Sequence, residues 1–197
     1  MTPKITGLIL AGGRGSRMGS VDKGLQLFQG KPMVAHVLKR FQPQVDEILI
    51  NANRSIDAYS AFGHRVIPDA IDGFAGPLAG LHVGMTHASH ALVATAPCDS
   101  PFLPLDLITR LSIAMHATNA DLAVAKTFDQ PHPVFCLVKT SLASHLQSFL
   151  ESGQRKIDKW YATLNVVEVA FDDEEAAFSN ITTVAELKSF EQTPPQT

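Results

Sequence analysis

The chain has 197 residues and a net charge of −3 at pH 7, and 45% of its residues are hydrophobic and 18% charged. This is the composition of a soluble globular protein of one domain, and it excludes collagen-like, coiled-coil and disordered chains. The negative net charge excludes a broad basic field that would hold nucleic acid or an anionic membrane surface. We therefore expect no nucleic-acid partner and no membrane partner.

Cysteine usage and the N-terminal residues favour a cytoplasmic location. Cys98 and Cys136 form no CxxC motif and no disulfide framework, as expected in a reducing compartment. The first apolar run is interrupted by Gly7 and leads into a glycine-rich loop instead of a cleavage site, so we predict no signal peptide. No stretch approaches the roughly 20 apolar residues that span a bilayer.

The first half of the chain alternates short apolar runs with segments of helical period. The apolar runs predict strands at residues 6–10, 47–51, 65–67 and 91–96. Apolar residues at helical spacing follow Pro32 and Pro77, and they predict helices over residues 33–41 and 78–85. Proline is well tolerated in the first turn of a helix, so both prolines mark helix starts.

The second half continues the alternation. It predicts strands at residues 122–126, 134–138 and 166–169, and helices at 105–115, 142–150 and 183–190, the last one capped by Thr182 or Thr183. This is the pattern of βαβ units throughout, so the predicted fold class is α/β, with a mostly parallel central sheet and helices on both faces. We expect one domain over residues 1–191 and a frayed tail over residues 192–197.

The strongest functional signal is the glycine-rich loop after the first predicted strand. Residues 8–19 read Leu-Ile-Leu-Ala-Gly-Gly-Arg-Gly-Ser-Arg-Met-Gly. Residues without Cβ let backbone N–H groups close around phosphate oxygens, and Arg14 and Arg17 add positive charge. The dinucleotide motif GxGxxG fails because Met18 stands at its third glycine, and the P-loop motif fails because Leu25 stands at its first. The alternative is a tight turn with solvated arginines.

Polar residues also follow the other predicted strands of the first half. Asn51 ends the second strand, Asp69 follows the third and Asp99 follows the fourth. The carboxyl ends of parallel strands meet at one sheet edge, so we expect these side chains to share a crevice with the glycine loop. A carboxylate such as Asp99 suits Mg²⁺ on a triphosphate, and Lys23 can reach phosphates as a compact charge. The alternatives are a turn cap for Asp99 and an ordinary surface position for Lys23.

Zinc binding and covalent catalysis find little support. His87 and His90 are spaced i, i+3 and have no cysteine or carboxylate companion at zinc-site spacing. The chain has no GxSxG motif, and neither cysteine lies in a convincing nucleophile signature. We expect Cys98 to be a small buried side chain beneath the crevice.

The chain resembles the molybdenum cofactor guanylyltransferases. The resemblance runs through Leu10-Ala-Gly-Gly, Arg17-Met-Gly, Asp22-Lys-Gly, Gly30-Lys-Pro, Asn51-Ala-Asn-Arg54, Asp69, Gly76-Pro-Leu-Ala-Gly80, Pro97-Cys-Asp-Ser-Pro101 and His132-Pro133. It implies a Rossmann-like nucleotidyltransferase fold and an Mg²⁺-dependent enzyme. In such an enzyme, molybdenum-bound molybdopterin attacks the α-phosphate of GTP, molybdopterin guanine dinucleotide forms and pyrophosphate leaves.

The resemblance also implies roles for individual residues. The implied GTP contacts are Leu10, Ala11, Gly12, Gly13, Lys23, Asn51, Asp69 and Asp99, with Asp99 as the Mg²⁺ ligand and with Lys23, Arg17 and Asp99 as the catalytic set. The implied pterin contacts in the C-terminal half are His132, Arg155, Lys156 and Asn180, whose alternative is an ordinary loop or surface position. One departure stands out: Thr182 and Val184 occupy positions where the family has asparagine and proline.

Other functions remain as alternatives at this stage. Related cytidylyltransferases and sugar-phosphate nucleotidylyltransferases commonly have Leu-Ala-Ala-Gly where this chain has Leu10-Ala-Gly-Gly13, which favours guanine. A non-catalytic nucleotide-binding carrier is the alternative from a different class, and the presence of both Lys23 and Asp99 favours the enzyme. Beyond the two substrates, the partners that the resemblance implies are molybdenum-insertion enzymes and apo-molybdoenzymes.

Overall fold

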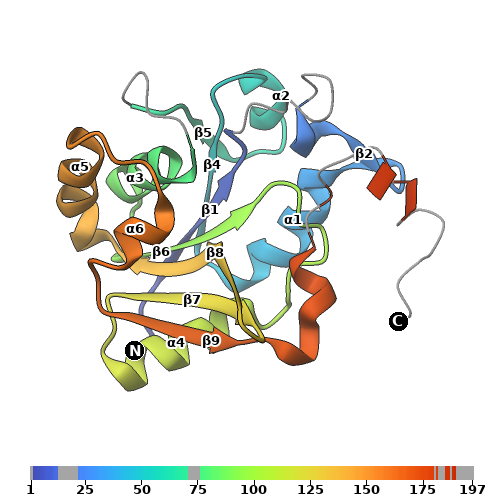
Figure 1. The fold of residues 1–197 in the computed structure, drawn as a ribbon. Coiled ribbons are helices and arrows are strands. Elements are labelled where there is room, and N and C mark those ends of the chain that lie inside the picture. The colour runs from blue at the N-terminus through green and yellow to red at the C-terminus, as the bar shows by residue number, and fades with distance from the viewer. Residues whose placement is uncertain are drawn as a thin grey trace.

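A seven-stranded sheet forms the centre of the computed structural model, which describes residues 2–12, 22–70, 76–179, 181, 185–186 and 188–189. The strand order is β5-β4-β1-β6-β8-β7-β9 (Figure 1). The strands are β1 (Ile5–Leu10), β4 (Glu47–Asn51), β5 (Arg65–Ile67), β6 (Leu92–Pro97), β7 (Leu122–Thr127), β8 (Gln130–Lys139) and β9 (Val166–Ala170). The short strands β2 (Leu27–Phe28) and β3 (Lys31–Pro32) pair separately.

The sheet is mostly parallel, as predicted, but the βαβ alternation fails at one place. Strand β8 runs antiparallel to both of its neighbours, β6 and β7. It begins at Gln130, four residues before the predicted start, and passes through Pro131 and Pro133. Its pairing with β6 covers only Leu137 to Lys139, so the prolines lie where one side of the strand is not paired with β6 and a missing N–H costs little.

The helix predicted over residues 33–41 has the observed bounds, and the three helices predicted over residues 78–85, 105–115 and 142–150 are present with ends shifted by one to three residues. The helices are α1 (Met33–Phe41), α2 (Ile56–Ser60), α3 (Pro77–His87), α4 (Leu107–Thr118), α5 (Ala143–Glu151) and α6 (Ile157–Tyr161), with 3-10 turns η2 (Lys23–Leu25), η3 (Gln42–Gln44), η4 (Thr140–Leu142) and η5 (Asp172–Phe178). The short helices α2 and α6 were not predicted. In the predicted helix 183–190, the described residues 185–186 and 188–189 are helical. None of the described helices is long and apolar enough to cross a membrane.

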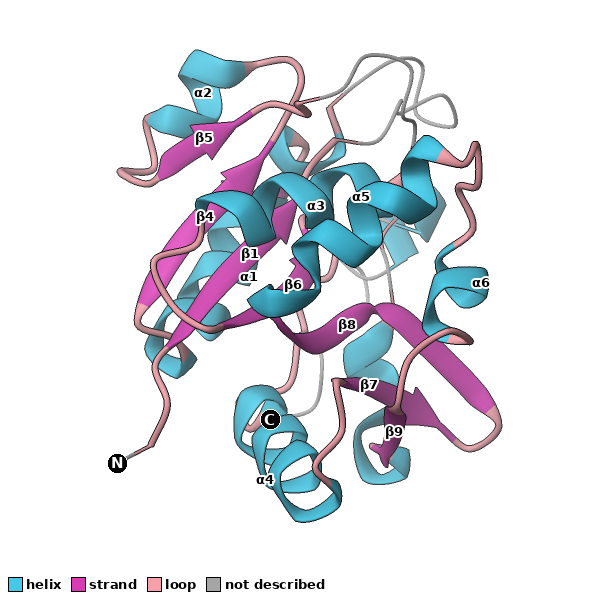
Figure 2. Cartoon of the chain, turned by 90° about the vertical axis from the view of Figure 1, so that its left-hand side faces the viewer, coloured by secondary structure: helices cyan, strands magenta, loops and turns pink. Residues whose placement is uncertain are grey.

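Helices cover both faces of the sheet, as predicted (Figure 2). Side chains alternate between the faces along each strand. Ile9 of β1 packs with α1 and α4 on one face, and its neighbour Leu8 packs with α3, α5 and α6 on the other. The central strands β1, β4 and β6 are therefore almost wholly buried, and the edge at which their carboxyl ends meet is left for polar residues.

Candidate active site

Three neighbouring parallel strands deliver their carboxyl ends to one edge of the sheet. The N–H of Ala11 donates to the carbonyl of Asn51 at 2.8 Å, and the N–H of Cys98 donates to the carbonyl of Leu10 at 3.1 Å. These bonds continue the pairing past the last residue of β1 and β6. The segments after β4, β1 and β6 therefore leave the sheet side by side, as the sequence predicted.

Asp69 is held at this edge by two asparagines. The Nδ2 atom of Asn51 donates to Asp69 Oδ1 at 2.9 Å and to the carbonyl of Ile67 at 3.1 Å. The Nδ2 atom of Asn53 donates to Asp69 Oδ2 at 3.0 Å, and the N–H of Asp69 donates back to Asn53 Oδ1 at 2.8 Å. We call Asn51, Asn53 and Asp69 the amide clamp, because an amide donor reaches each oxygen of the carboxylate.

Two glycines allow the chain to approach the amide clamp closely. A Cβ atom on Gly12 would lie 3.1 Å from Asn51 Oδ1 and 3.3 Å from Asn53 Nδ2, which is tighter than ordinary contact. A Cβ atom on Gly80, in the first turns of α3, would overlap Asn51 Oδ1. Gly12 and the first turns of α3 thus contact the clamp closely, which brings the predicted contacts Gly12, Asn51 and Asp69 together.

Lys23 and Asp99 form an ion pair at the same edge. Lys23 Nζ lies 3.8 Å from Asp99 Oδ2, and the side chains are 26% and 9% exposed. Burial raises the pKa of Asp99 above its ordinary value, although Lys23 acts in the opposite direction. Burial therefore dominates, and the carboxylate would gain from further positive charge. Arg17, the third residue of the predicted catalytic set, lies outside the described residues. The predicted GTP contact Gly13 also lies outside them.

The Asp22–Lys23–Gly24 segment rests on a buried tyrosine that the sequence did not indicate. Tyr59 of α2 is fully buried, and its hydroxyl donates to Asp22 Oδ1. Burial raises the pKa of Tyr59 far above its ordinary value, so the phenol stays a donor. A Cβ atom on Gly24 would overlap the tyrosine oxygen and lie 3.0 Å from Cys98 Cβ. The segment that carries Lys23 is therefore packed tightly from below.

Cys98 occupies the buried position predicted for it. Its side chain is 7% exposed, and burial raises the pKa of the thiol. A thiol with a raised pKa is a weak nucleophile, so Cys98 serves packing and not covalent chemistry.

The residues at this edge fit a magnesium ion that takes some of its ligands from a bound nucleotide. Within the described ranges, no three His, Cys, Asp or Glu side chains gather in a way that could hold a metal ion. Mg²⁺ commonly uses only one or two carboxylates and takes its other ligands from phosphates and water. Asp99 satisfies this requirement, because it is a buried carboxylate whose raised pKa reflects incomplete compensation of its charge.

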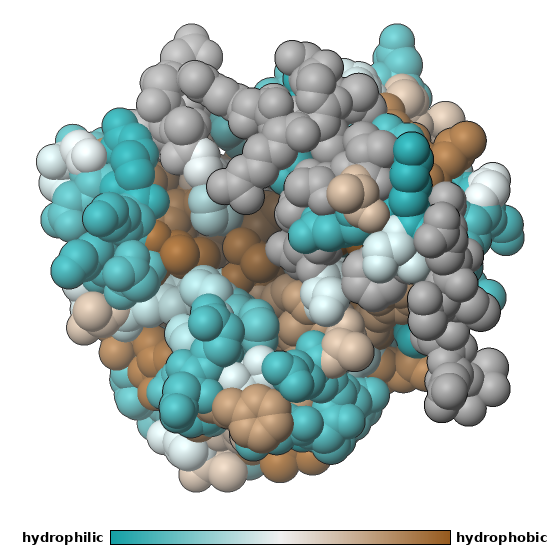
Figure 3. Space-filling view, turned by 45° about the vertical axis from the view of Figure 1, so that its right-hand side comes forward, coloured by the Kyte–Doolittle hydropathy of each residue, from teal (hydrophilic) through white to brown (hydrophobic). Residues whose placement is uncertain are grey.

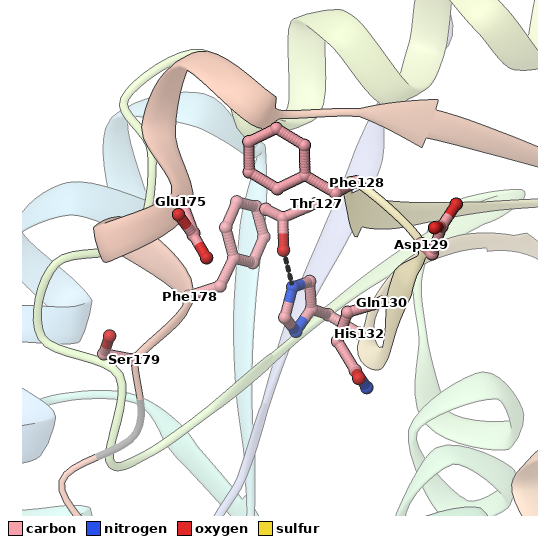
Figure 4. Close-up of a pocket in the computed structure, with 8 residues that line it drawn as sticks. All are labelled: Thr127, Phe128, Asp129, Gln130, His132, Glu175, Phe178 and Ser179. Atoms are coloured by element: carbon pink, nitrogen blue, oxygen red, sulfur yellow. Dashed lines mark hydrogen bonds between the residues drawn. The ribbon is translucent and has the colours of Figure 1, made fainter.

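A cavity, the hairpin pocket, lies between the β7–β8 turn and η5 (Figure 4). Its volume is about 550 Å³. The lining residues are Thr127, Phe128, Asp129, Gln130, His132, Glu175, Phe178 and Ser179. Apart from this pocket, the face drawn in Figure 3 shows a hollow next to the grey atoms, with hydrophobic atoms at its bottom.

His132 is the most constrained polar side chain of the hairpin pocket. Its Nε2 atom lies 2.7 Å from Thr127 Oγ1, and its ring stacks on Phe178 at a centroid distance of 4.7 Å and an angle of 16°. Burial lowers the pKa of His132 from 6.5, so the ring is neutral at pH 7. Phe128, in the turn, has a left-handed φ of 52° and is 58% exposed. A bulky residue rarely adopts this conformation, and such residues cluster at functional sites.

The hairpin pocket is connected to Asp99 by a short segment of chain. The N–H of Ile181 donates to the backbone carbonyl of Asp99 at 2.9 Å. Ile181 is fully buried and lies two residues after Ser179, which lines the pocket. Ser179 at the pocket and Ile181 at Asp99 are therefore only two residues apart in the chain.

Two of the other predicted pterin contacts, Arg155 and Lys156, lie outside this pocket. Arg155 Nη1 donates to the carbonyls of Leu150 and Gln154 at 3.0 and 2.9 Å, and the first of these bonds caps the end of α5. Neither Arg155 nor Lys156 lines the hairpin pocket. Asn180 and the departing positions Thr182 and Val184 lie outside the described residues.

Four residues gain importance from the structure. Asn53 and Gly80 stand inside recognised motifs, yet only the structure shows what they contact. Tyr59 carries one weak signal, as an aromatic residue in a polar stretch. Phe178 had none, because it reaches His132 only through the packing of η5 on the hairpin.

Comparisons with known proteins extend over almost the whole chain. Residues 7–167 match the family described as the MobA-like NTP transferase domain. The molybdenum cofactor guanylyltransferase of Ralstonia nicotianae is 53% identical over 95% of this chain and 96% of its own length. That of Bordetella petrii is 54% identical over 93% and 95%. Among solved structures, molybdopterin-guanine dinucleotide biosynthesis protein A from Archaeoglobus fulgidus is 26% identical, with a TM-score of 0.80 over 95% of this chain and 97% of its own.

Proposed function

The chain belongs to the molybdenum cofactor guanylyltransferases, and from this premise we propose that it transfers GMP from GTP to molybdenum-bound molybdopterin. The products are molybdopterin guanine dinucleotide and pyrophosphate. The observation that carries the proposal is the meeting of the Lys23–Asp99 ion pair and the amide clamp at one edge of the sheet. The triphosphate of a nucleotide needs positive charge and a metal ligand, which Lys23 and Asp99 supply. The nucleobase needs hydrogen-bonding groups in fixed positions, which the amide clamp supplies.

The reaction requires positioning more than proton transfer. The attacking group is a terminal phosphate monoester, whose second pKa is about 6, so it is largely ionised at neutral pH without a general base. The difficulty is that two anions must meet in line. The backbone N–H groups of Gly12 and Gly13 and the Lys23 ammonium offset this repulsion, and Arg17 completes the proposed set of cations.

Asp99 is the residue that would hold Mg²⁺. When bound, the ion neutralises charge on the phosphates and on the departing pyrophosphate. Lys23, at the start of η2, pairs with the same carboxylate. The role of Lys23 is to orient the nucleotide before the transfer and to balance the charge that develops on the leaving group.

The hairpin pocket is the proposed binding place of the pterin. A flat heterocycle stacks well on aromatic faces, and the pocket offers Phe178, His132 and the exposed Phe128. Ile181, whose N–H donates to the Asp99 carbonyl, lies two residues after Ser179 of the pocket, which supports a place for the pterin near the nucleotide. Asn180, which directly follows Ser179, stays a prediction for this region. Arg155 and Lys156 stay predictions for a more distant part of the substrate.

The finer assignments belong to the same proposal. GTP is the nucleotide, Mg²⁺ is the metal and the cytoplasm is the location. Molybdenum-insertion enzymes and apo-molybdoenzymes are the proposed partners before and after the transfer.

The test is a nucleotide panel scored by pyrophosphate release. Purified protein with Mg²⁺ and molybdenum-loaded molybdopterin should release pyrophosphate with GTP and much less with CTP, ATP or UTP. Lys23→Ala should lower kcat/KM for GTP by roughly 10- to 150-fold, the equivalent of a charge-assisted hydrogen bond. The matched control is Lys39→Ala, at an exposed position of α1, which should leave the rate unchanged.

The panel also separates the alternatives. A preference for CTP would make the protein a cytidylyltransferase. GTP binding without pyrophosphate release would make it a carrier.

A further inference from the structure

The two asparagines of the amide clamp differ in what they hold. Asn51 is 2% exposed and spans from the end of β4 to the carbonyl of Ile67, so it ties two strands together as well as contacting Asp69. Asn53 is exposed and makes a two-point contact with Asp69, as a donor to Oδ2 at 3.0 Å and as an acceptor from the N–H at 2.8 Å. Asn53 therefore contributes to the orientation of Asp69 without belonging to the core.

The orientation of Asp69 matters because the residue is half-buried at the mouth of the site. A carboxylate in such a position rotates readily about its side-chain bonds unless both oxygens are restrained. The amide donors of Asn51 and Asn53 restrain one oxygen each, and each oxygen keeps a further lone pair for a ligand. The clamp thus presents two acceptors in a fixed plane.

Two fixed acceptors distinguish the nucleotide bases. Guanine carries adjacent N–H donors on its ring and its amino group, which match a carboxylate. Cytosine and adenine place an acceptor beside their amino group, so the same carboxylate would meet one donor and one repelling lone pair. The discrimination depends on the orientation of the carboxylate, because misalignment weakens a hydrogen bond steeply.

We propose that Asn53 is a positioning residue for nucleotide selection, which fixes the plane of the Asp69 carboxylate next to Gly12. The inference rests on the proposed function, since it assumes that Asp69 meets the base of GTP. It assigns to Asn53 no contact with the reacting phosphates. Loss of Asn53 should therefore act on nucleotide affinity and choice, and leave the chemical step alone.

The test compares Asn53→Asp with Asn53→Ala. If Asn53 only fills space, Asn53→Ala should do more damage; if Asn53 positions Asp69, Asn53→Asp should do more damage. Asn53→Asp keeps the size of the side chain but replaces the Nδ2 donor by an oxygen that faces Asp69 Oδ2, so the carboxylate is pushed away. Asn53→Ala only removes the restraint. We expect Asn53→Ala to raise KM for GTP on the order of tenfold and to lower the GTP-to-CTP ratio of kcat/KM. We expect Asn53→Asp to do both more strongly.

In both variants, kcat at saturating GTP and KM for molybdopterin should stay near the wild-type values. Asn165→Ala removes an exposed asparagine side chain at the start of β9, at the other end of the sheet, and serves as the matched control. Melting temperatures of all variants should lie close together, because Asn53 is exposed.

The outcomes separate failure of this inference from failure of the proposed function. If the wild-type protein does not transfer GMP, the proposed function is wrong and Asp69 has no assigned ligand. If the wild-type protein prefers GTP and both variants keep that preference, Asn53 has no positioning role. An Asn53→Asp variant that resembles the wild type more closely than Asn53→Ala does would also overturn the inference, because it would point to space filling.

Discussion

The sheet edge and the hairpin pocket are built by different means. At the sheet edge, the described polar side chains are joined by hydrogen bonds and an ion pair. In the hairpin pocket, contacts between rings predominate: His132 stacks on Phe178, which also contacts Phe135 edge to face. The first arrangement fixes charges and donors in space, as a triphosphate requires. The second offers flat surfaces, as a ring system requires.

Burial shifts the pKa values of Asp99 and His132 in opposite directions. It raises the pKa of Asp99 and lowers that of His132. For a carboxylic acid and for an imidazole alike, burial favours the neutral form. At pH 7 the carboxylate of Asp99 is nonetheless the form that Lys23 and a metal ion would stabilise, whereas the pKa of His132 is lowered by burial. The sheet edge therefore stores unfavourable charge that a ligand relieves.

The largest expected effect comes from removing that charge. Asp99→Asn should lower GMP transfer on the order of 100-fold or more, because Mg²⁺ binds through anionic oxygen. The same variant should be slightly more stable than the wild type at pH 7. The folded-state pKa of Asp99 is raised above 3.8, so the wild type loses stability as the pH rises through that pKa. Activity assays across a magnesium titration and melting curves at pH 3.5 and 7 measure both effects.

Asp121→Asn is the matched control for this change. Asp121 pairs with Lys139 at 3.4 Å, and both side chains are 36% exposed. Removing its charge should leave GMP transfer unchanged. Wild-type activity of Asp99→Asn at every magnesium concentration would remove Asp99 from the mechanism, and the comparison between the two regions would lose its electrostatic half.

The same comparison explains how much the sequence could predict. Asn51 is the last residue of β4, and Asp69 and Asp99 lie two residues after the ends of β5 and β6, so local pattern and parallel topology suffice to bring them together. The hairpin pocket depends on a strand that contains Pro131 and Pro133 and on the docking of η5, which places Phe178 on His132. No local pattern encodes that contact, because it joins residues that are far apart in the chain.

An intermediate effect is expected in the hairpin pocket. His132→Phe keeps a ring that can stack on Phe178 but removes the polar atom beside Thr127. If the pterin binds here, KM for molybdopterin should rise roughly tenfold, the equivalent of one lost hydrogen bond, while KM for GTP should not change. His116→Phe, at an exposed position of α4, is the matched control and should alter neither constant.

The same variant tests whether burial lowers the pKa of His132. Its folded-state pKa lies below 6.5, so the stability that comes from keeping the ring neutral is present above pH 6.5 and is lost as the pH falls through the lowered pKa. The melting temperature of His132→Phe should therefore fall less than that of the wild type between pH 7 and pH 5. Equal slopes would mean that His132 titrates as an ordinary exposed histidine.

The smallest effect is expected beneath the sheet edge, where Tyr59 supports the lysine segment. Tyr59→Phe removes the hydroxyl that donates to Asp22 Oδ1, and Asp22 Oδ2 is already buried without a hydrogen-bond partner among the described residues. A carboxylate left with neither oxygen paired in place is costly, about 1 to 3 kcal/mol, so we expect it to turn toward water and to displace Lys23. KM for GTP should rise by about threefold, a fraction of the effect of losing Lys23 itself.

Tyr161→Phe separates this support from general stability. Tyr161 is also buried, and its hydroxyl donates to the carbonyl of Pro133 at 2.5 Å, so both substitutions remove one buried hydroxyl donor. Urea unfolding should give comparable losses of stability for the two variants, while only Tyr59→Phe should change KM for GTP. If both variants raise KM for GTP equally, the effect is one of global stability. The buried tyrosine would then have no particular connection to the lysine above it, and the ion pair at the sheet edge would be positioned by the backbone of the Asp22–Gly24 segment alone.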